Sequence, residues 1–139
     1  MYKYQAKAIM KEFYKDTRPR GLKTEELLIK ENADGSTLIF EISSMEGDVG
    51  YTWVMLDGNG NIVCDEGDSA GFNYCHELFD SINEIRYWNS KFCYTVEWID
   101  KKTPKFTFLN KETGKTYKGW ADFYEQEKID TRYVSTKDL

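Results

Sequence analysis

The stretch from Tyr51 to Cys64, YTWVMLDGNGNIVC, carries the clearest signal for the fold. Its first half is apolar on both alternations, which is typical of a β-strand that is covered on both faces. An Asn- and Gly-rich turn at 58–61 then leads into a second apolar run at 62–64. A turn of this kind between two apolar runs predicts a β-hairpin. The stretch therefore indicates an antiparallel sheet with at least one strand covered on both sides.

Alternating apolar and polar residues predict further strands on both sides of this hairpin. These strands are expected over residues 27–31, 38–43, 92–99, 106–108 and 116–117. Asp34-Gly35 lies between the first two runs, and Glu112-Thr113-Gly114 precedes the last one. Because Asp, Thr and Gly at such positions favour turns, we expect a hairpin at each.

Residues 69–87 have the periodicity of an amphipathic helix. Seven apolar side chains fall on one side, namely Phe72, Tyr74, Cys75, Leu78, Phe79, Ile82 and Ile85. Polar and acidic side chains cluster opposite, namely Asn73, Glu77, Asp80 and Glu84. Asp68 or Ser69 can cap the first amides of this helix.

The two ends of the chain are less regular. Residues 4–15 fit both a helix and a strand, and we favour the helix; DTRPRG at 16–21 is expected to be a loop, and 121–128 a short helix. The predicted fold class is α+β, with an antiparallel sheet of about six strands built from hairpins. One long amphipathic helix, about 69–87, packs on this sheet, and short terminal helices complete a single domain over 1–139.

The charge is distributed unevenly along the chain. Residues 1–24 hold seven basic and two acidic side chains, residues 25–90 hold two basic and fourteen acidic ones, and the whole chain has a net charge of −5. An acidic middle segment repels nucleic acid and anionic membranes and favours a basic partner. We therefore expect neither direct nucleic-acid binding nor membrane binding.

The three cysteines, Cys64, Cys75 and Cys93, share no CxxC spacing and lie in apolar surroundings. We interpret them as free buried thiols in a reducing compartment. Lysines interrupt the N-terminal stretch where a signal peptide needs an apolar run. These features predict a cytoplasmic protein.

The string from Asp57 to Asp68 has oxygen-bearing side chains at the spacing of a calcium-binding loop. Two features disagree with that site: Ile62 replaces the glycine at the sixth position, and Asp68 replaces the bidentate glutamate at the twelfth. A hairpin turn explains the string better.

His76 is the single histidine of the chain, and it lies beside Cys75 on the predicted helix. Adjacent helical side chains point about 100° apart, which is poor geometry for a Cys–His pair. A zinc site from His76 and the cysteines lacks the spacing of a compact finger. No phosphate-binding glycine loop, nucleophile elbow or dinucleotide fingerprint is present, so we expect no enzyme activity and no cofactor or metal.

The favoured hypothesis is a non-catalytic inhibitor that docks an acidic face on a basic protein, such as an enzyme that processes nucleic acid. Its predicted contacts are Glu77, Asp80 and Glu84 with Asp65, Glu66 and Asp68. Hairpins alternating with one acidic helix over 69–127 resemble immunity proteins of bacterial toxin systems. The resemblance implies that the protein is an inhibitor, and phage inhibitors of host defences use acidic faces in the same way. No residue role is transferred from either class.

The alternative hypothesis is a protein that binds or sequesters a small ligand in an aromatic pocket. Its predicted lining is Trp53, Trp98, Tyr94 and Phe108, with Arg18, Arg20 or Arg132 for an anionic group. A small enzyme that uses carboxylates and tyrosine ranks below both.

Overall fold

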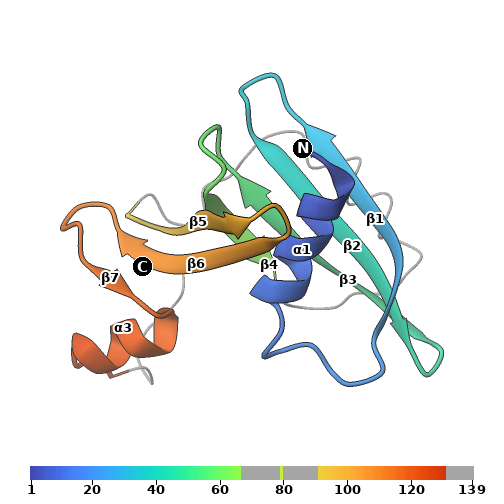
Figure 1. Ribbon diagram of the computed structural model, residues 1–139. Helices are drawn as coiled ribbons and strands as arrows, with labels where there is room; N and C mark the ends of the chain where they lie inside the picture. The colour runs from blue at the N-terminus through green and yellow to red at the C-terminus, as the bar shows by residue number, and fades with distance from the viewer. Residues whose placement is uncertain (67–78, 80–90, 131–139) are drawn as a thin grey trace.

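The computed structural model describes residues 1–66, 79 and 91–130. They form one antiparallel sheet in which all seven strands follow each other in sequence order (Figure 1). The elements are α1 (Lys3–Phe13), β1 (Lys23–Glu31), β2 (Thr37–Met45), β3 (Asp48–Leu56), β4 (Ile62–Glu66), β5 (Phe92–Asp100), β6 (Thr103–Asn110), β7 (Thr116–Tyr117) and α3 (Trp120–Gln126). The α+β class and the antiparallel sheet are confirmed, with seven strands where about six were predicted. Neither of these two helices has the length and apolar character needed to cross a membrane.

Short turns set the order of the strands. The predicted hairpins at Asp34-Gly35, at 58–61 and at 112–114 are all present. The β2–β3 turn was missed: Glu46 and Gly47 both adopt positive φ angles, of 51° and 87°. A two-residue turn with positive φ at both positions matches the twist of the flanking strands, so β2 and β3 stay in register over their full length.

Helix α1 covers one face of the sheet, as Figure 1 shows. The amide of Tyr2 donates a hydrogen bond to the Gln5 side chain, 3.3 Å away, at the start of this helix. Apolar residues at helical spacing pack on β2, β3 and β4; they are Ala6, Ile9 and Met10 of α1 and Tyr14, the residue that follows the helix. The prediction of a helix near residues 4–15 is confirmed.

A second group of aromatic residues joins α3 to β5, β6 and β7. It contains Phe92, Phe108, Tyr117 and Phe123. The ring of Phe108 lies 4.4 Å from that of Trp120, between their centroids. Because large rings supply much apolar area per residue, this group can anchor a helix of only seven residues.

The opposite face of the sheet is also buried. Phe40 and Ile42 are completely inaccessible to solvent there, and the ring centroid of Phe79 lies 5.8 Å from that of Phe40. Phe79 is helical, whereas the remainder of the long helix predicted over 69–87 lies outside the described residues. The run from Tyr51 is apolar on both alternations because it belongs to β3, and β3, like β2, buries side chains on both faces of the sheet.

The sheet has a narrow junction in the middle. The register of β4 with β5, which are not joined by a short turn, contains one pair, Ile62 with Tyr94, whereas the hairpins β2–β3 and β5–β6 pair over many residues. Helix α1 contacts β1 and β2 on one side of this junction and β6 on the other. Its Phe13 packs edge to face on Tyr94 and Phe106, with centroid distances of 5.0 and 5.4 Å. The helix therefore holds the two halves of the sheet together.

Candidate functional site: a lysine-lined groove

The six acidic residues predicted to bind a partner belong mainly to the part of the chain outside the described residues. Asp65 and Glu66 end β4, opposite Val54 and Trp53 of β3, and only their backbone is described. The other four, Asp68, Glu77, Asp80 and Glu84, lie outside the described residues. Their contribution to function stays a prediction.

The structure does not bring the four aromatic residues of the predicted ligand pocket together. Tyr94 and Phe108 contact each other on the α1 side of the sheet, with ring centroids 5.1 Å apart, and Trp98 packs on the same side. Trp53 packs with Phe40 on the other side. Sequence alternation assigns faces within a strand, but it does not relate strands separated by a long connection.

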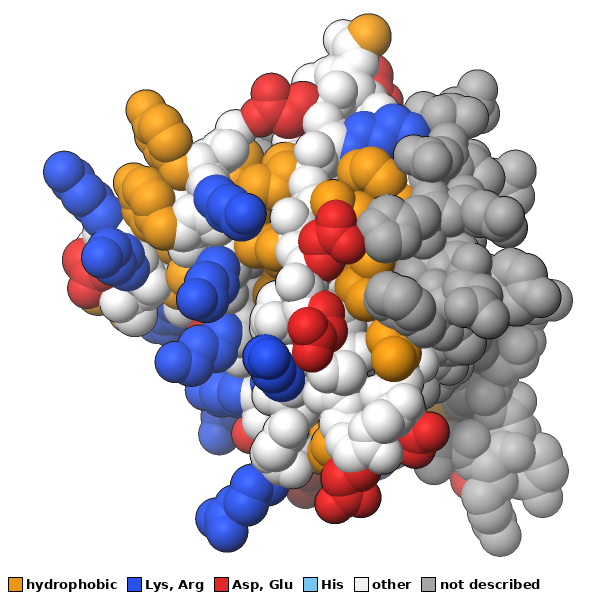
Figure 2. All heavy atoms as spheres, turned by 90° about the vertical axis from the view of Figure 1, so that its right-hand side faces the viewer, with side chains coloured by type: hydrophobic (Ala, Val, Ile, Leu, Met, Phe, Trp, Pro, Cys, Tyr) orange, Lys and Arg blue, Asp and Glu red, His pale blue; other side chains and the backbone are white. Residues whose placement is uncertain are grey.

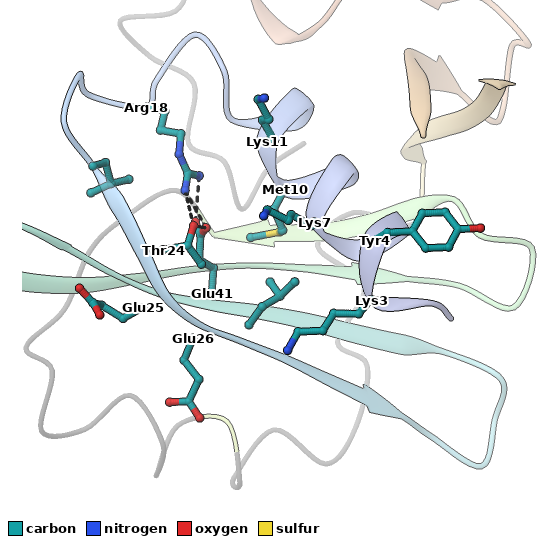
Figure 3. A pocket seen from close by; sticks show the side chains of 12 residues that line it. Lys3, Tyr4, Lys7, Met10, Lys11, Arg18, Thr24, Glu25, Glu26 and Glu41 are labelled. Carbon is teal, nitrogen blue, oxygen red and sulfur yellow. Dashed lines mark hydrogen bonds and ion pairs between the residues drawn. The ribbon is translucent and has the colours of Figure 1, made fainter. Parts of the chain in front are cut away.

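A groove of about 750 Å³ runs between α1 and β1 (Figure 3). Lys3, Lys7 and Lys11 of α1 line one side of it. The lining on the β1 side includes Leu22, Thr24 and Leu27, and Met10 lies beneath. The lysines come from successive turns of one helix, and most of the facing residues come from one strand. Regular secondary structure therefore sets the spacing of the side chains along the groove.

At one end of the groove, Glu41 of β2 is buried with 3% of its surface exposed. Its carboxylate accepts two hydrogen bonds from Arg18, at 2.9 Å from Nη1 and 2.6 Å from Nη2. The hydroxyls of Thr24 and Thr52 also donate to it, at 2.5 and 3.3 Å. Bidentate pairing and two hydroxyl donors offset the cost of burying this carboxylate.

Of the three arginines predicted to meet an anionic ligand, Arg18 is thus engaged within the protein. Its guanidinium holds the loop after α1 against the sheet. Arg20 is exposed in the same loop, and Arg132 lies outside the described residues. The only signal for the Glu41 pairing in the sequence is a single carboxylate in the otherwise apolar and hydroxyl-bearing run TLIFEISS.

The groove is lined by basic side chains on α1 and by the carboxylates of Glu25 and Glu26 on β1, besides the paired Arg18 and Glu41. Within the described part of the chain, no carboxylate lies within 4.0 Å of the ammonium groups of Lys3, Lys7 or Lys11. Figure 3 shows that Glu25 and Glu26, which belong to the lining, extend from β1 away from α1. In Figure 2, basic side chains gather on one side of this view and acidic side chains lie beside them. The groove can therefore attract anionic groups.

A second cleft, of about 910 Å³, lies between α1, the β5–β6 hairpin and the start of α3. Its aromatic lining comes from Phe13, Tyr94, Phe106 and Trp120. Lys105 and Lys118 also line it. Aromatic surfaces next to ammonium groups suit an amphipathic anion.

The predicted turn at 57–61 is confirmed, and Asp57 takes part in it. One oxygen of its carboxylate accepts the amides of Asn59 and Asn61, at 2.9 and 3.0 Å. The flanking segments are strands, which agrees with the hairpin and disagrees with a helix-flanked calcium loop. The carboxylate of Asp57 therefore stabilises the turn by accepting backbone amides.

Cys93 is free and buried, and burial raises the pKa of its thiol. The side chain of Cys64 and all of Cys75 and His76 lie outside what the structure describes. Among the described residues, no three His, Cys, Asp or Glu side chains gather as a metal site would require. A raised thiol pKa keeps Cys93 protonated and poorly nucleophilic at neutral pH.

Comparison with protein-family models, with curated proteins and with solved structures gives no match to this chain. Its function is therefore argued from its own residues.

Proposed function

We propose that this protein is a non-catalytic, acidic inhibitor that docks on a basic protein, of the kind that immunity proteins and phage anti-defence proteins represent. Its target would be a basic enzyme, such as one that processes nucleic acid. The proposed contacts are the acidic residues Glu77, Asp80 and Glu84, with Asp65, Glu66 and Asp68. Neither nucleic acid nor a membrane is a proposed partner.

One observation carries this proposal: α1 and Phe79 pack on opposite faces of the same sheet. The basic segment at residues 1–24 has a balance of +5, so the remainder of the chain has a balance of −10. Placing the basic helix on one face leaves the excess of acidic residues to the rest of the molecule. We propose that this charge separation along the sequence also becomes a separation in space, with the acidic face away from α1.

The described contact of Phe79 supports the proposed orientation of the acidic residues. Phe79 belongs to the apolar side of the helical pattern at 69–87, and it packs on Phe40. In that pattern Glu77, Asp80 and Glu84 lie on the opposite side. We propose that a helix over 69–87 places its apolar side on the sheet and its carboxylates outward.

An outward acidic face would mainly raise the rate at which the protein associates with a basic partner. Matched charge steers two proteins together and disfavours partners of the same charge. Binding should therefore weaken as ionic strength rises, since salt screens exposed charges over about 8–10 Å.

A pull-down from the lysate of the native source, washed at low and high salt, tests this proposal. The variant carries E77K, D80K and E84K, and a matched control carries E97K, E112K and E125K, three exposed positions elsewhere. We expect a basic protein to be retained by the wild type and the control and lost by the variant, with circular dichroism confirming that both variants fold. Equal retention by all three proteins would refute this face as the interface.

A second candidate function, the binding of a small ligand, is favoured by the cleft between α1 and α3. Its aromatic lining and the nearby Lys105 and Lys118 suit an anionic aromatic metabolite. Such a ligand should raise the melting temperature with little dependence on salt. Gly119→Leu tests the site, because an added Cβ meets no described heavy atom closer than the Tyr94 hydroxyl, 3.9 Å away, and the extra side chain should reduce the thermal shift.

A further inference from the structure

We propose that the groove between α1 and β1 binds an acidic helical segment of a protein partner. This site lies on the basic side of the molecule and is independent of the acidic interface proposed above. Lys3, Lys7 and Lys11 would contact carboxylates of the partner, and the apolar side chains beneath them would contact its aliphatic residues.

The spacing of the lysines suggests the form of the partner. The three residues are four apart in sequence, and at about 1.5 Å per residue the row is about 12 Å long. A partner helix with carboxylates four residues apart repeats at the same interval, because i and i+4 share one face of a helix. Each ammonium group can thus meet one carboxylate.

The ammonium groups are available for such contacts. All three lysines are exposed, and the described residues place no carboxylate within ion-pair distance of them. The buried carboxylate nearest the groove, Glu41, is already paired with Arg18. An incoming carboxylate would therefore not have to displace an existing ion pair of these lysines.

The surroundings of the groove favour a peptide over a nucleic acid. Glu25 and Glu26 line the groove on its β1 side, and exposed Glu31 ends the strand. A phosphate backbone carries negative charge on all sides and would meet these carboxylates in the groove. A helix can present acidic side chains to α1 and neutral ones to β1, so it avoids this repulsion.

Apolar surface adjoins the lysine row. Leu22 and Leu27 are half-buried in the groove, and Tyr4 is 40% exposed and stacks on Tyr2 at a centroid distance of 5.6 Å. Exposed aromatic rings and partly covered aliphatic side chains are common anchors in protein interfaces. They would add affinity to the charge contacts.

The groove is also held in shape before binding. The ion pair of Arg18 with Glu41, together with the Thr24 hydroxyl, ties the loop after α1 and the start of β1 to the sheet. A site with a fixed loop needs less ordering when a ligand binds. The pair thus has a positioning role for the groove.

The experiment uses the full chain and a fluorescein-labelled helical peptide with glutamates at three positions four residues apart and leucines beside them. We expect fluorescence anisotropy to show binding that weakens with salt. The variant K3E/K7E/K11E should lose about ten-fold or more in affinity. The matched control K101E/K111E/K128E, which has the same charge but changes exposed residues outside the groove, should retain binding.

A second variant keeps the proposal testable if the triple substitution affects folding. E25Q/E26Q removes the carboxylates on the β1 side, and we expect it to strengthen peptide binding and to permit binding of a single-stranded oligonucleotide, which the wild type should reject. Equal weakening by both lysine variants, no binding of the peptide, or wild-type binding of the oligonucleotide at the groove would each overturn the proposal. These results do not depend on Glu77, Asp80 or Glu84, so they are distinct from the pull-down.

Discussion

The two faces of the sheet are both apolar, but they are covered in different ways. On one face, the described helix α1 packs three buried residues on the sheet and exposes lysines. On the other face, Phe40 and Ile42 are completely buried, and Phe79 contributes a half-buried helical contact. The difference shows that a sheet with two apolar faces can use one covering layer for basic residues and leave the other free to carry a different charge.

The largest expected effect tests whether the second face is a true core. Phe40→Ala should lower the free energy of unfolding by about 3–5 kcal/mol, because it leaves a cavity beside Tyr51 and Phe79. Urea denaturation measures the change. Ile99→Ala is the control, since Ile99 is 66% exposed and its loss should cost less than about 0.5 kcal/mol. A loss of only that size for Phe40→Ala would show that the face is not a core.

The next effect concerns the ion pair on the α1 face. Arg18→Ala leaves the Glu41 carboxylate buried without its cation, and we expect a loss of about 2–3 kcal/mol in the free energy of unfolding. This figure is reduced from that of a fully buried pair because the Arg18 side chain is 20% exposed. The double variant R18L/E41L should recover most of the loss. If the double variant is less stable than Arg18→Ala, the pair stabilises the fold beyond removing an unpaired charge.

A smaller effect is expected where α1 is tied to β3. The Tyr14 hydroxyl donates a hydrogen bond to the carbonyl of Trp53, 2.7 Å away. Tyr14→Phe should cost about 1 kcal/mol in thermal or urea unfolding, since one hydrogen bond is lost and the ring is kept. Tyr2→Phe, at an exposed ring, serves as the control and should leave stability unchanged.

The smallest effect is a pH dependence at a site away from both faces. The Tyr117 hydroxyl, followed by Lys115, lowers the pKa of Glu127 below its usual value of 4.5. A lowered folded-state pKa contributes stability above the unfolded pKa, and this contribution disappears as the pH falls through the folded pKa. Glu127→Gln should therefore flatten the loss of stability between about pH 5 and about pH 3.

The control for this pH effect is Tyr117→Phe, which removes the hydroxyl that contributes most to the pKa shift. It should flatten the acid profile partially. An unchanged profile for Glu127→Gln would contradict the assignment. Neither variant should alter the contacts of Phe40 or of Arg18, which belong to other groups of residues.

Much of the sheet could be predicted because local chemistry sets the turns. Asp34-Gly35 and the Asn–Gly turn at 58–61 each identify a hairpin, and sequential hairpins give the observed strand order. Glu46-Gly47 was overlooked although its glycine is a usable signal for a two-residue turn. The predicted strand over 38–43 and the apolar run from Tyr51 leave residues 44–50 between them, so a turn of only two residues was not indicated there.

The candidate groove could be predicted only in part. The spacing of Lys3, Lys7 and Lys11 already placed them on one side of a helix. Their position beside β1 depends on how α1 crosses the sheet, which local periodicity does not specify. The pairing of Arg18 with Glu41 joins residues 23 apart in sequence, and no pattern at that separation indicates it.

The single residue pair between β4 and β5 has a consequence for how the chain folds. Sequential hairpins need only short loops to close, so each half of the sheet can form early at a small loop-closure cost. Joining the halves requires Phe13 to reach Tyr94 and Phe106, which are far from it in sequence. We therefore expect the docking of the eleven-residue helix α1, which contacts strands of both halves, to complete the native structure after the hairpins have formed.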